Sequence, residues 1–239
     1  MNADHTIEET ENVGFRAGVR ACVPTLLGYL SIGFAAGVVE HTAGLTLAEI
    51  ILMSSLVYAG SAQFIAAGMI ASHGSPAAIV LTVFFVNLRH LLLSAALSPY
   101  FRRLSPTKNA LIGALLTDET FGVAIQAAAK RSAIDERWMH GLNVTAYVNW
   151  VLANAAGAVF GQWIADPESL GLDFALPAMF IGLLVLSVIG RGNVRLDVLV
   201  AVCAVAIVVG VGPYVAGSTG IIVATVLAAA IGMAVERWK

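Results

Sequence analysis

Long apolar segments recur along nearly the whole chain, and they restrict its fold more than any other feature. A helix needs about 20 mostly apolar residues to cross the hydrocarbon core of a bilayer. Of the 239 residues, 59% are hydrophobic and 12% are charged, whereas about a quarter of the residues in soluble domains are charged. We therefore expect an all-α, polytopic integral membrane protein that is surrounded by the lipid bilayer.

Hydropathy predicts about seven or eight transmembrane segments within one membrane domain, residues 14–239. The candidates are Phe15–Val39, Leu47–Ala71, Pro76–Leu97, Asn109–Lys130, Trp138–Ile164, Phe174–Gly190, Leu196–Val211 and Gly220–Val235. Residues 1–13 are polar and acidic and lack the basic start of a secretory signal. We interpret them as a disordered cytoplasmic tail.

Basic residues predict the orientation, because Lys and Arg are enriched in cytoplasmic loops. Arg16 and Arg20 favour a cytoplasmic N-terminus, and Arg237 and Lys239 favour a cytoplasmic C-terminus. The basic loop Tyr100–Lys108 conflicts with this arrangement, since it would be external if every segment crossed once. Either the rule is broken locally, or two of the first four segments are broken or re-entrant, which membrane proteins permit where irregular backbone lines a cavity. We favour the second interpretation.

Small and helix-breaking residues indicate where those breaks lie. The first segment contains Pro24, and the second contains a small polar interruption from Tyr58 to Gln63. Gly33-x-x-x-Gly37 and Gly157-x-x-x-Gly161 also fit a simpler interpretation, close packing between helices. A weak internal similarity relates Pro24 with Ala59-Gly60-Ser61 to Pro177 with Ala216-Gly217-Ser218, which suggests a possible inverted repeat.

Charged residues lie in the middle of two apolar segments, where insertion into the bilayer is expensive at roughly 2.5–3.5 kcal/mol each. Arg89 and His90 lie in the third segment, and Asp118 and Glu119 lie in the fourth. At about 1.5 Å rise per residue, Arg89 and Asp118 reach a similar depth, roughly 12–14 Å from the same face. We expect Arg89 to pair with Asp118, and Glu119 or His90 to carry a proton. An ion pair that only holds two helices together is the alternative.

A polar stripe follows the fifth segment, where Asn143, Tyr147 and Asn154 share one helical face with Trp150 and two glycines. The stripe fits either a polar path through the protein or hydrogen bonds that join helices.

Several classes of protein find no support in the sequence. A net charge of −2 and the lack of a basic tract argue against nucleic acid as a partner. Cys22 and Cys203 lie in apolar runs and fit buried small residues, so we expect no metal site and no cofactor. There is no Gly-x-Ser-x-Gly or His-Glu-x-x-His motif, and we expect no enzyme activity. An ion or proton channel, or a structural subunit of a transport complex, stays an alternative.

Four motifs in order resemble the AzlC family, the large subunit of bacterial branched-chain amino acid exporters. They are Tyr58-Ala-Gly-Ser-Ala-Gln63-Phe64, Val86-Asn-Leu-Arg-His90, Leu116-Thr-Asp-Glu-Thr-Phe121 and Gly171-Leu-Asp-Phe-Ala-Leu-Pro177-Ala-Met-Phe180. The resemblance implies export of leucine, isoleucine, valine and sometimes methionine across the bacterial plasma (inner) membrane. It also implies a small membrane partner of the AzlD type. A secondary transporter, coupled to protons, fits both the resemblance and the mid-segment charges.

An amino acid with an aliphatic side chain needs donors for its carboxylate and acceptors for its ammonium group. We expect the break at Tyr58, Gly60 and Ser61, together with Gln63, to hold the carboxylate. Asn87, Asp118 or nearby carbonyl groups would hold the ammonium group, so the predicted site lies between the second, third and fourth segments.

Overall fold

The structure is a computed structural model, and it describes residues 14–128, 134–164, 168–171, 174, 177–178, 181–182, 185, 194–211, 227–228 and 230–235. The chain divides into two compact units, Met1–Pro177 and Ala178–Lys239, which are described separately. The described residues form helices and turns and contain no strand. The predicted all-α membrane fold is thereby confirmed.

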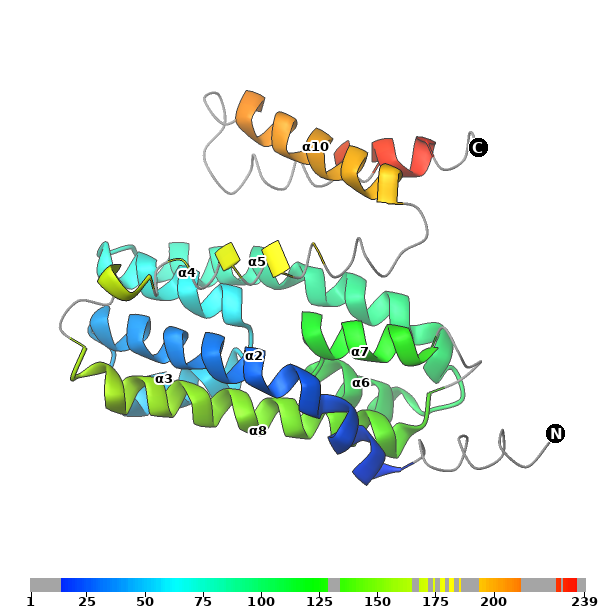
Figure 1. Cartoon of the computed structure of the whole chain (residues 1–239), viewed down its shortest axis with the longest axis horizontal. Coiled ribbons are helices and arrows are strands. Elements are labelled where there is room, and N and C mark those ends of the chain that lie inside the picture. Colours follow the sequence, from blue (N-terminus) through cyan, green and yellow to red (C-terminus); the bar gives the residue numbers. More distant parts are fainter. Residues whose placement is uncertain are drawn as a thin grey trace. The chain divides into compact units, whose positions relative to one another are not determined.

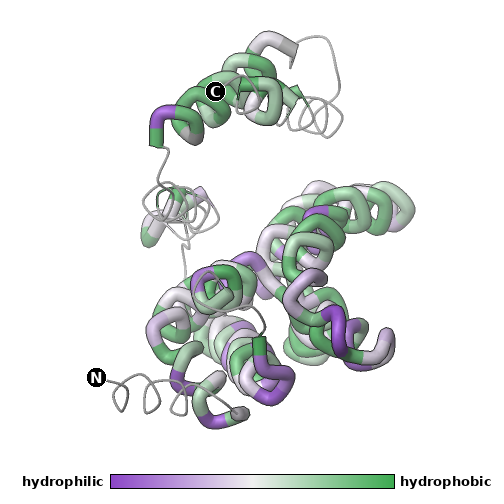
Figure 2. The backbone as a smooth tube through the Cα atoms, turned by 90° about the vertical axis from the view of Figure 1, so that its right-hand side faces the viewer, coloured by the Kyte–Doolittle hydropathy of each residue, from purple (hydrophilic) through white to green (hydrophobic). Residues whose placement is uncertain are grey.

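Three long helices run along unit 1: α2 (Phe15–Thr42), α5 (Pro76–Leu97) and α8 (Glu136–Gly161). The 3-10 helix η1 (Ser98–Phe101) extends α5. Within the described residues, these three are the helices long and apolar enough to cross a membrane. They correspond to the first, third and fifth predicted segments. Apolar residues cover much of their length (Figure 2), and large side chains of α5 such as Val80 and Leu91 are exposed, as lipid contact requires.

The second and fourth predicted segments are each broken into two short helices. The second forms α3 (Leu47–Leu56) and α4 (Gly60–Ala71), and the fourth forms α6 (Pro106–Ala114) and α7 (Asp118–Ala128). With 9 to 12 residues each, none of them reaches the length of a single crossing. Figure 1 shows α3 and α4 together at the left end of unit 1, and α6 and α7 together at its right end. Both pairs are therefore re-entrant hairpins, which enter from opposite ends.

The order of the helices contains an inverted repeat. A long helix, α2, is followed by the hairpin α3–α4, and a second long helix, α5, is followed by the hairpin α6–α7. In Figure 1, α2 runs from right to left and α5 runs from left to right, so the two halves have opposite directions. The weak similarity found in the sequence relates other residues, and of its second half the residues 216–218 lie outside the described residues.

Helices α2 and α8 pack with their backbones in contact (Figure 1). A Cβ atom built on Gly37 would lie 2.1 Å from the Asn154 carbonyl oxygen, and one built on Gly157 would lie 2.1 Å from the Phe34 carbonyl oxygen. Real Cβ atoms do not approach backbone so closely, so these positions require glycine. The packing interpretation of the Gly-x-x-x-Gly patterns therefore describes this helix pair.

The hairpins remove the conflict over the basic loop. Because the segment Leu47–Ala71 turns back, η1 and the start of α6 lie at the same end of unit 1 as the starts of α2 and α8 (Figure 1). The Lys108 Nζ atom pairs with Glu136 Oε2 at 2.8 Å across this end. The described basic residues that gather there are Arg16, Arg20, Arg102, Arg103, Lys108 and Arg137. The turns at the opposite end, residues 43–46 and 72–75, carry no Lys or Arg.

Unit 2 contains α10 (Val194–Val211), which includes the predicted segment Leu196–Val211. Residues 230–235 are helical and pack against α10, because a Cβ built on Gly232 would lie 2.8 Å from Val200 Cγ2. Most of the predicted segments Phe174–Gly190 and Gly220–Val235 lies outside the described residues.

The hairpins predict which turns face the same side of the membrane. In a variant with Cys22 and Cys203 replaced by Ala, we expect Ser72→Cys in intact cells to react with a membrane-impermeant maleimide. We expect Arg103→Cys to react only after permeabilisation, because the basic end is cytoplasmic by the positive-inside rule. Single crossings by every segment would give the reverse pattern at both positions.

The close contact between α2 and α8 predicts a large effect of one methyl group. We expect Gly157→Ala to lower the free energy of unfolding by about 1–3 kcal/mol, because the added atom forces the helices apart. Thermal unfolding in detergent measures this change. Gly122→Ala is the control, since a Cβ there meets nothing within 4 Å. Equal stability of the two variants would contradict the contact.

Candidate functional site

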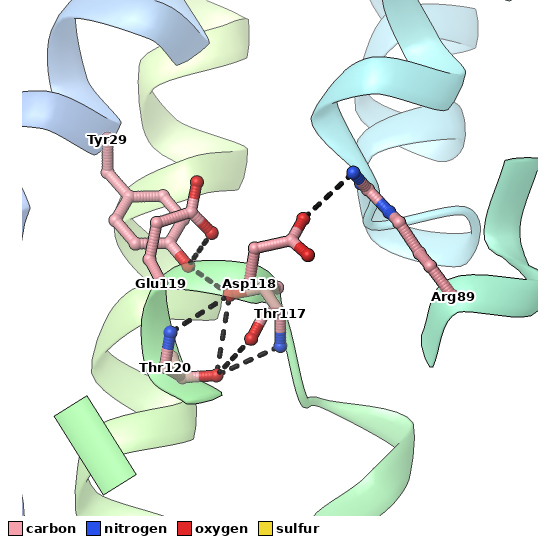
Figure 3. Close-up of polar contacts among 6 residues, drawn as sticks. All are labelled: Tyr29, Arg89, Thr117, Asp118, Glu119 and Thr120. Atoms are coloured by element: carbon pink, nitrogen blue, oxygen red, sulfur yellow. Dashed lines mark hydrogen bonds and ion pairs between the residues drawn. The ribbon is translucent and has the colours of Figure 1, made fainter. Parts of the chain in front are cut away.

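The two breaks approach each other beside Tyr29 of α2 and Trp150 of α8. The Tyr29 hydroxyl donates to Glu119 Oε2 at 3.0 Å and shares a short hydrogen bond with the Thr117 hydroxyl (Figure 3). The Tyr29 ring meets the Trp150 ring edge-on, with 5.8 Å between centroids. Trp150 in turn covers Gly60, where a Cβ would lie 2.9 Å from Cη2 of the indole. Aromatic side chains of the long helices therefore connect the ends of both hairpins.

The first break, residues 57–59, leaves the start of α4 without a cap. Tyr58 has φ 42°, a left-handed conformation that is unfavourable for a bulky residue and typical of functional sites. The N-cap residue Ala59 has no side-chain hydrogen bond to the helix, and the first turn contains no acidic residue. The Ser61 hydroxyl is 1% exposed and has no hydrogen-bond partner within the described residues. The same is true of the buried Tyr58 hydroxyl.

The second break, residues 115–117, is capped and carries negative charge. The Thr117 hydroxyl accepts from the Thr120 amide at 3.3 Å, and the Thr120 hydroxyl accepts from the Thr117 amide at 2.9 Å. Asp118 and Glu119 occupy the first turn of α7, where acidic side chains compensate the helix dipole. The N-terminus of α4 therefore offers free hydrogen-bond donors, whereas the N-terminus of α7 offers a carboxylate.

The predicted ion pair between Arg89 and Asp118 is present, with 2.9 Å between Nη1 and Oδ2. Figure 3 shows Asp118 and Glu119 pointing in opposite directions from the start of α7, toward Arg89 and toward Tyr29. The pair ties α7 to α5, and both side chains are about one fifth exposed. Asn87 and His90 lie on the same helix, and Asn87 Oδ1 and His90 Nε2 are buried without a hydrogen-bond partner among the described residues.

The polar stripe on α8 binds the carbonyl groups that the helix breaks leave free. Asn143 Nδ2 donates to the Ile112 carbonyl at 3.0 Å, in the last turn of α6. The Tyr147 hydroxyl donates to the Ser55 carbonyl at 3.1 Å, in the last turn of α3. Carbonyl groups at a helix end have no partner in their own helix and need one from elsewhere. These contacts correspond to the predicted hydrogen bonds that join helices.

Gln63 lies in a fully buried cluster that includes a carboxyl group which the sequence analysis did not identify. Its Nε2 atom lies 2.8 Å from Glu40 Oε1, 3.1 Å from Ser54 Oγ and 3.2 Å from Asn154 Oδ1. Its Oε1 atom accepts from Trp150 Nε1 at 2.8 Å. The Gln63 amide is thus fully engaged in bonds to the protein.

Sequence reasoning missed Glu40 because the predicted first segment ended at Val39. The helix continues to Thr42. Glu40 follows Gly33 and Gly37 at offsets of seven and three positions, which places it on the face that packs against α8. This spacing was the available signal. Tyr29 gave no signal, since an aromatic residue in an apolar segment is ordinary.

An apolar cavity of about 290 Å³ lies between α5, η1 and α6. Its lining includes Leu91, Phe101, Ile112 and Leu116, together with the hydroxyls of Ser94 and Ser98. Leu116 directly precedes Thr117, so the cavity adjoins the second break.

Discontinuous helices that meet inside a membrane domain, with charged groups at the breaks, are typical of membrane transport proteins. Comparison with known proteins agrees with this class. Residues 24–164 match the AzlC protein family, and the chain belongs to that family of membrane transport proteins.

Curated relatives share roughly a third of the aligned residues. The chain is 30% identical to "Inner membrane protein YgaZ" of Escherichia coli over 72% of this chain and 73% of that protein. It is 29% identical to "Branched-chain amino acid transport protein AzlC" of Bacillus subtilis, over 70% of this chain and 65% of that protein. An uncharacterized membrane protein of Archaeoglobus fulgidus is 31% identical over 74% and 77% of the two chains. No solved structure shows a significant match to this chain.

The ion pair between α5 and α7 predicts non-additive effects of its two partners. We expect Arg89→Gln and Asp118→Asn each to lower the free energy of unfolding. The double variant is expected to lose less than the sum of the two single losses. The effects of substitutions at two residues in direct contact usually depart from additivity by about 0.5–3 kcal/mol. Thermal unfolding of the four proteins in detergent gives this difference. Strict additivity would show that the two groups do not interact.

Proposed function

We propose that this protein is a secondary transporter that exports branched-chain amino acids across the bacterial plasma membrane in exchange for protons. A small AzlD-type membrane subunit is the proposed partner, and leucine, isoleucine, valine and methionine are the proposed cargo. The name of the Bacillus subtilis relative, a branched-chain amino acid transport protein, supports the substrate class. The cytoplasmic position of the basic end, the N-terminus included, follows from the positive-inside rule.

One observation supports the proposal: groups that suit an anion lie at one break, and a group that suits a cation lies at the other. At the start of α4, free backbone N–H groups, the Ser61 hydroxyl and the helix dipole favour an anion. At the start of α7, the Glu119 carboxylate favours a cation. Tyr29 and Trp150 connect the two starts through contacts with Glu119 and Gly60. A free amino acid carries both charges, on a carboxylate and an ammonium group that are attached to the same Cα atom.

In the proposed complex, the amino acid carboxylate binds Gly60 and Ser61 at the start of α4, and Tyr58 closes the site with its hydroxyl. Glu119 accepts from the ammonium group. The apolar cavity beside Leu116 offers room for an aliphatic side chain, since its volume of about 290 Å³ is at the small end of ligand pockets. Gln63 positions Trp150 rather than touching cargo, and Arg89 with Asp118 fixes the start of α7. Asn87 and His90 stay candidates for later steps of the transport cycle.

Exchange of radioactive leucine across proteoliposomes tests the carboxylate site. We expect Ser61→Ala to raise the KM for leucine exchange about tenfold, because a hydrogen bond to a charged group contributes about 1.5–3 kcal/mol. Ser31→Ala is the matched control, since the exposed Ser31 hydroxyl bonds the Leu27 carbonyl of its own helix. Unchanged KM in the Ser61 variant would contradict the site. Leucine flux that does not saturate would favour a channel.

A further inference from the structure

A second buried carboxyl group, Glu40, lies away from the proposed substrate contacts. The side chain is fully buried between α2, α3, α4 and α8. One oxygen, Oε1, accepts from Gln63 at 2.8 Å. The other oxygen, Oε2, has no hydrogen-bond partner among the described residues. Gln63 from α4 binds this carboxyl, and Ser54 from α3 and Asn154 from α8 accept hydrogen bonds from the same Gln63 Nε2 atom. None of these three side chains carries a charge.

A buried carboxylate without a compensating charge is strongly unfavourable in a membrane protein. In the described part of the chain, no Lys or Arg pairs with Glu40. No group of three His, Cys, Asp or Glu side chains that could hold a metal ion occurs there either. A proton on Oε2 removes the charge, whereas a carboxylate oxygen at this position needs hydrogen-bond donors that the described residues do not offer. The surroundings of Glu40 therefore suit a group that takes up and releases a proton.

Gln63 connects Glu40 to the end of the first hairpin. Its amide hydrogens are shared among Glu40, Ser54 and Asn154, and its carbonyl oxygen holds the Trp150 indole. A charged Glu40 attracts the amide more strongly than a neutral one, because hydrogen bonds to ionised acceptors are about twice as strong. A change of charge on Glu40 therefore acts on Trp150, which covers Gly60 at the proposed carboxylate site.

We propose that Glu40 is the proton-binding site that couples proton entry to amino acid exit, an inference that rests on the proposed function. Glu40 lies two residues before the end of α2, at the end of unit 1 opposite to the basic residues. With the basic end in the cytoplasm, this position is near the outer face, where an exporter driven by the proton gradient takes up its proton. The proton binds at Oε2 from the outer water and leaves to the cytoplasm in the same cycle. No other bond changes.

Two transport modes in proteoliposomes separate coupling from binding. Exchange of leucine for leucine needs no net proton movement, whereas accumulation driven by a pH gradient does. We expect Glu40→Gln to keep at least half of the wild-type exchange rate and to lose at least tenfold of the gradient-driven accumulation. Glu49→Gln is the matched control. Glu49 is an exposed acid whose role in the capping box of α3 a glutamine preserves. We expect the Glu49→Gln control to keep both leucine exchange and gradient-driven accumulation.

Each outcome decides the proposal. Gradient-driven accumulation that survives in Glu40→Gln, or a parallel loss of exchange in a variant that elutes as a single species, would overturn the role of Glu40. If Glu40→Gln does not fold, Glu40→Asp replaces it, because it keeps a carboxyl group one methylene shorter. Gradient-driven accumulation by Glu40→Asp with a shifted pH dependence supports the proposal, and so does a loss of accumulation while leucine exchange stays intact. Accumulation with an unshifted pH dependence contradicts it. A wild-type protein without leucine exchange would refute the proposed function, whereas leucine accumulation driven by a sodium gradient alone would refute proton coupling.

Discussion

Backbone groups at a helix end that lies inside the bilayer must find partners within the protein, because lipid offers none. This requirement explains why the side chains of α8 lie where they do. Asn143 and Tyr147 bind carbonyl groups in the last turns of α6 and α3, so the two helices can stop in the middle of the domain. The hairpins, the short helices and the site between them all depend on these bonds.

The helices that begin after the two breaks, α4 and α7, differ in how their N-termini are capped. Thr117 and Thr120 satisfy the amides at the start of α7, and two acidic residues compensate its dipole. Ala59 at the corresponding position of α4 can do neither, and the nearby Ser61 and Tyr58 hydroxyls stay without partners. In an inverted repeat, such a difference between equivalent positions indicates a functional requirement rather than a structural one, since the capped solution was available to the same fold.

Local sequence patterns predicted the long helices and the break between Tyr58 and Gln63, because these depend on apolar length and on short polar interruptions. The break suggested at Pro24 is absent, since α2 continues through this residue. The break before Asp118 was not located, because no Pro or Gly marks it. The pairing of Arg89 with Asp118 followed from equal depth in neighbouring segments. The hairpin geometry did not follow, because hydropathy measures how apolar a segment is and contains no information on whether it turns back. Glu40 was missed for a related reason: a charge at the edge of an apolar run normally marks the aqueous boundary, whereas the packing of three other helices buries this one.

The glycine contacts between α2 and α8 have a mechanical consequence. Gly37 and Gly157 bring the two backbones together near the outer ends of these helices, and Gly18 and Gly141 do so near the basic ends, so neither helix can slide or tilt against the other without a clash. Helix α5, by contrast, has a single buried residue among its 22, Leu97. Any rearrangement that opens this domain first to one side and then to the other must therefore leave α2 and α8 as a fixed frame, and must displace α5 and the hairpins along it.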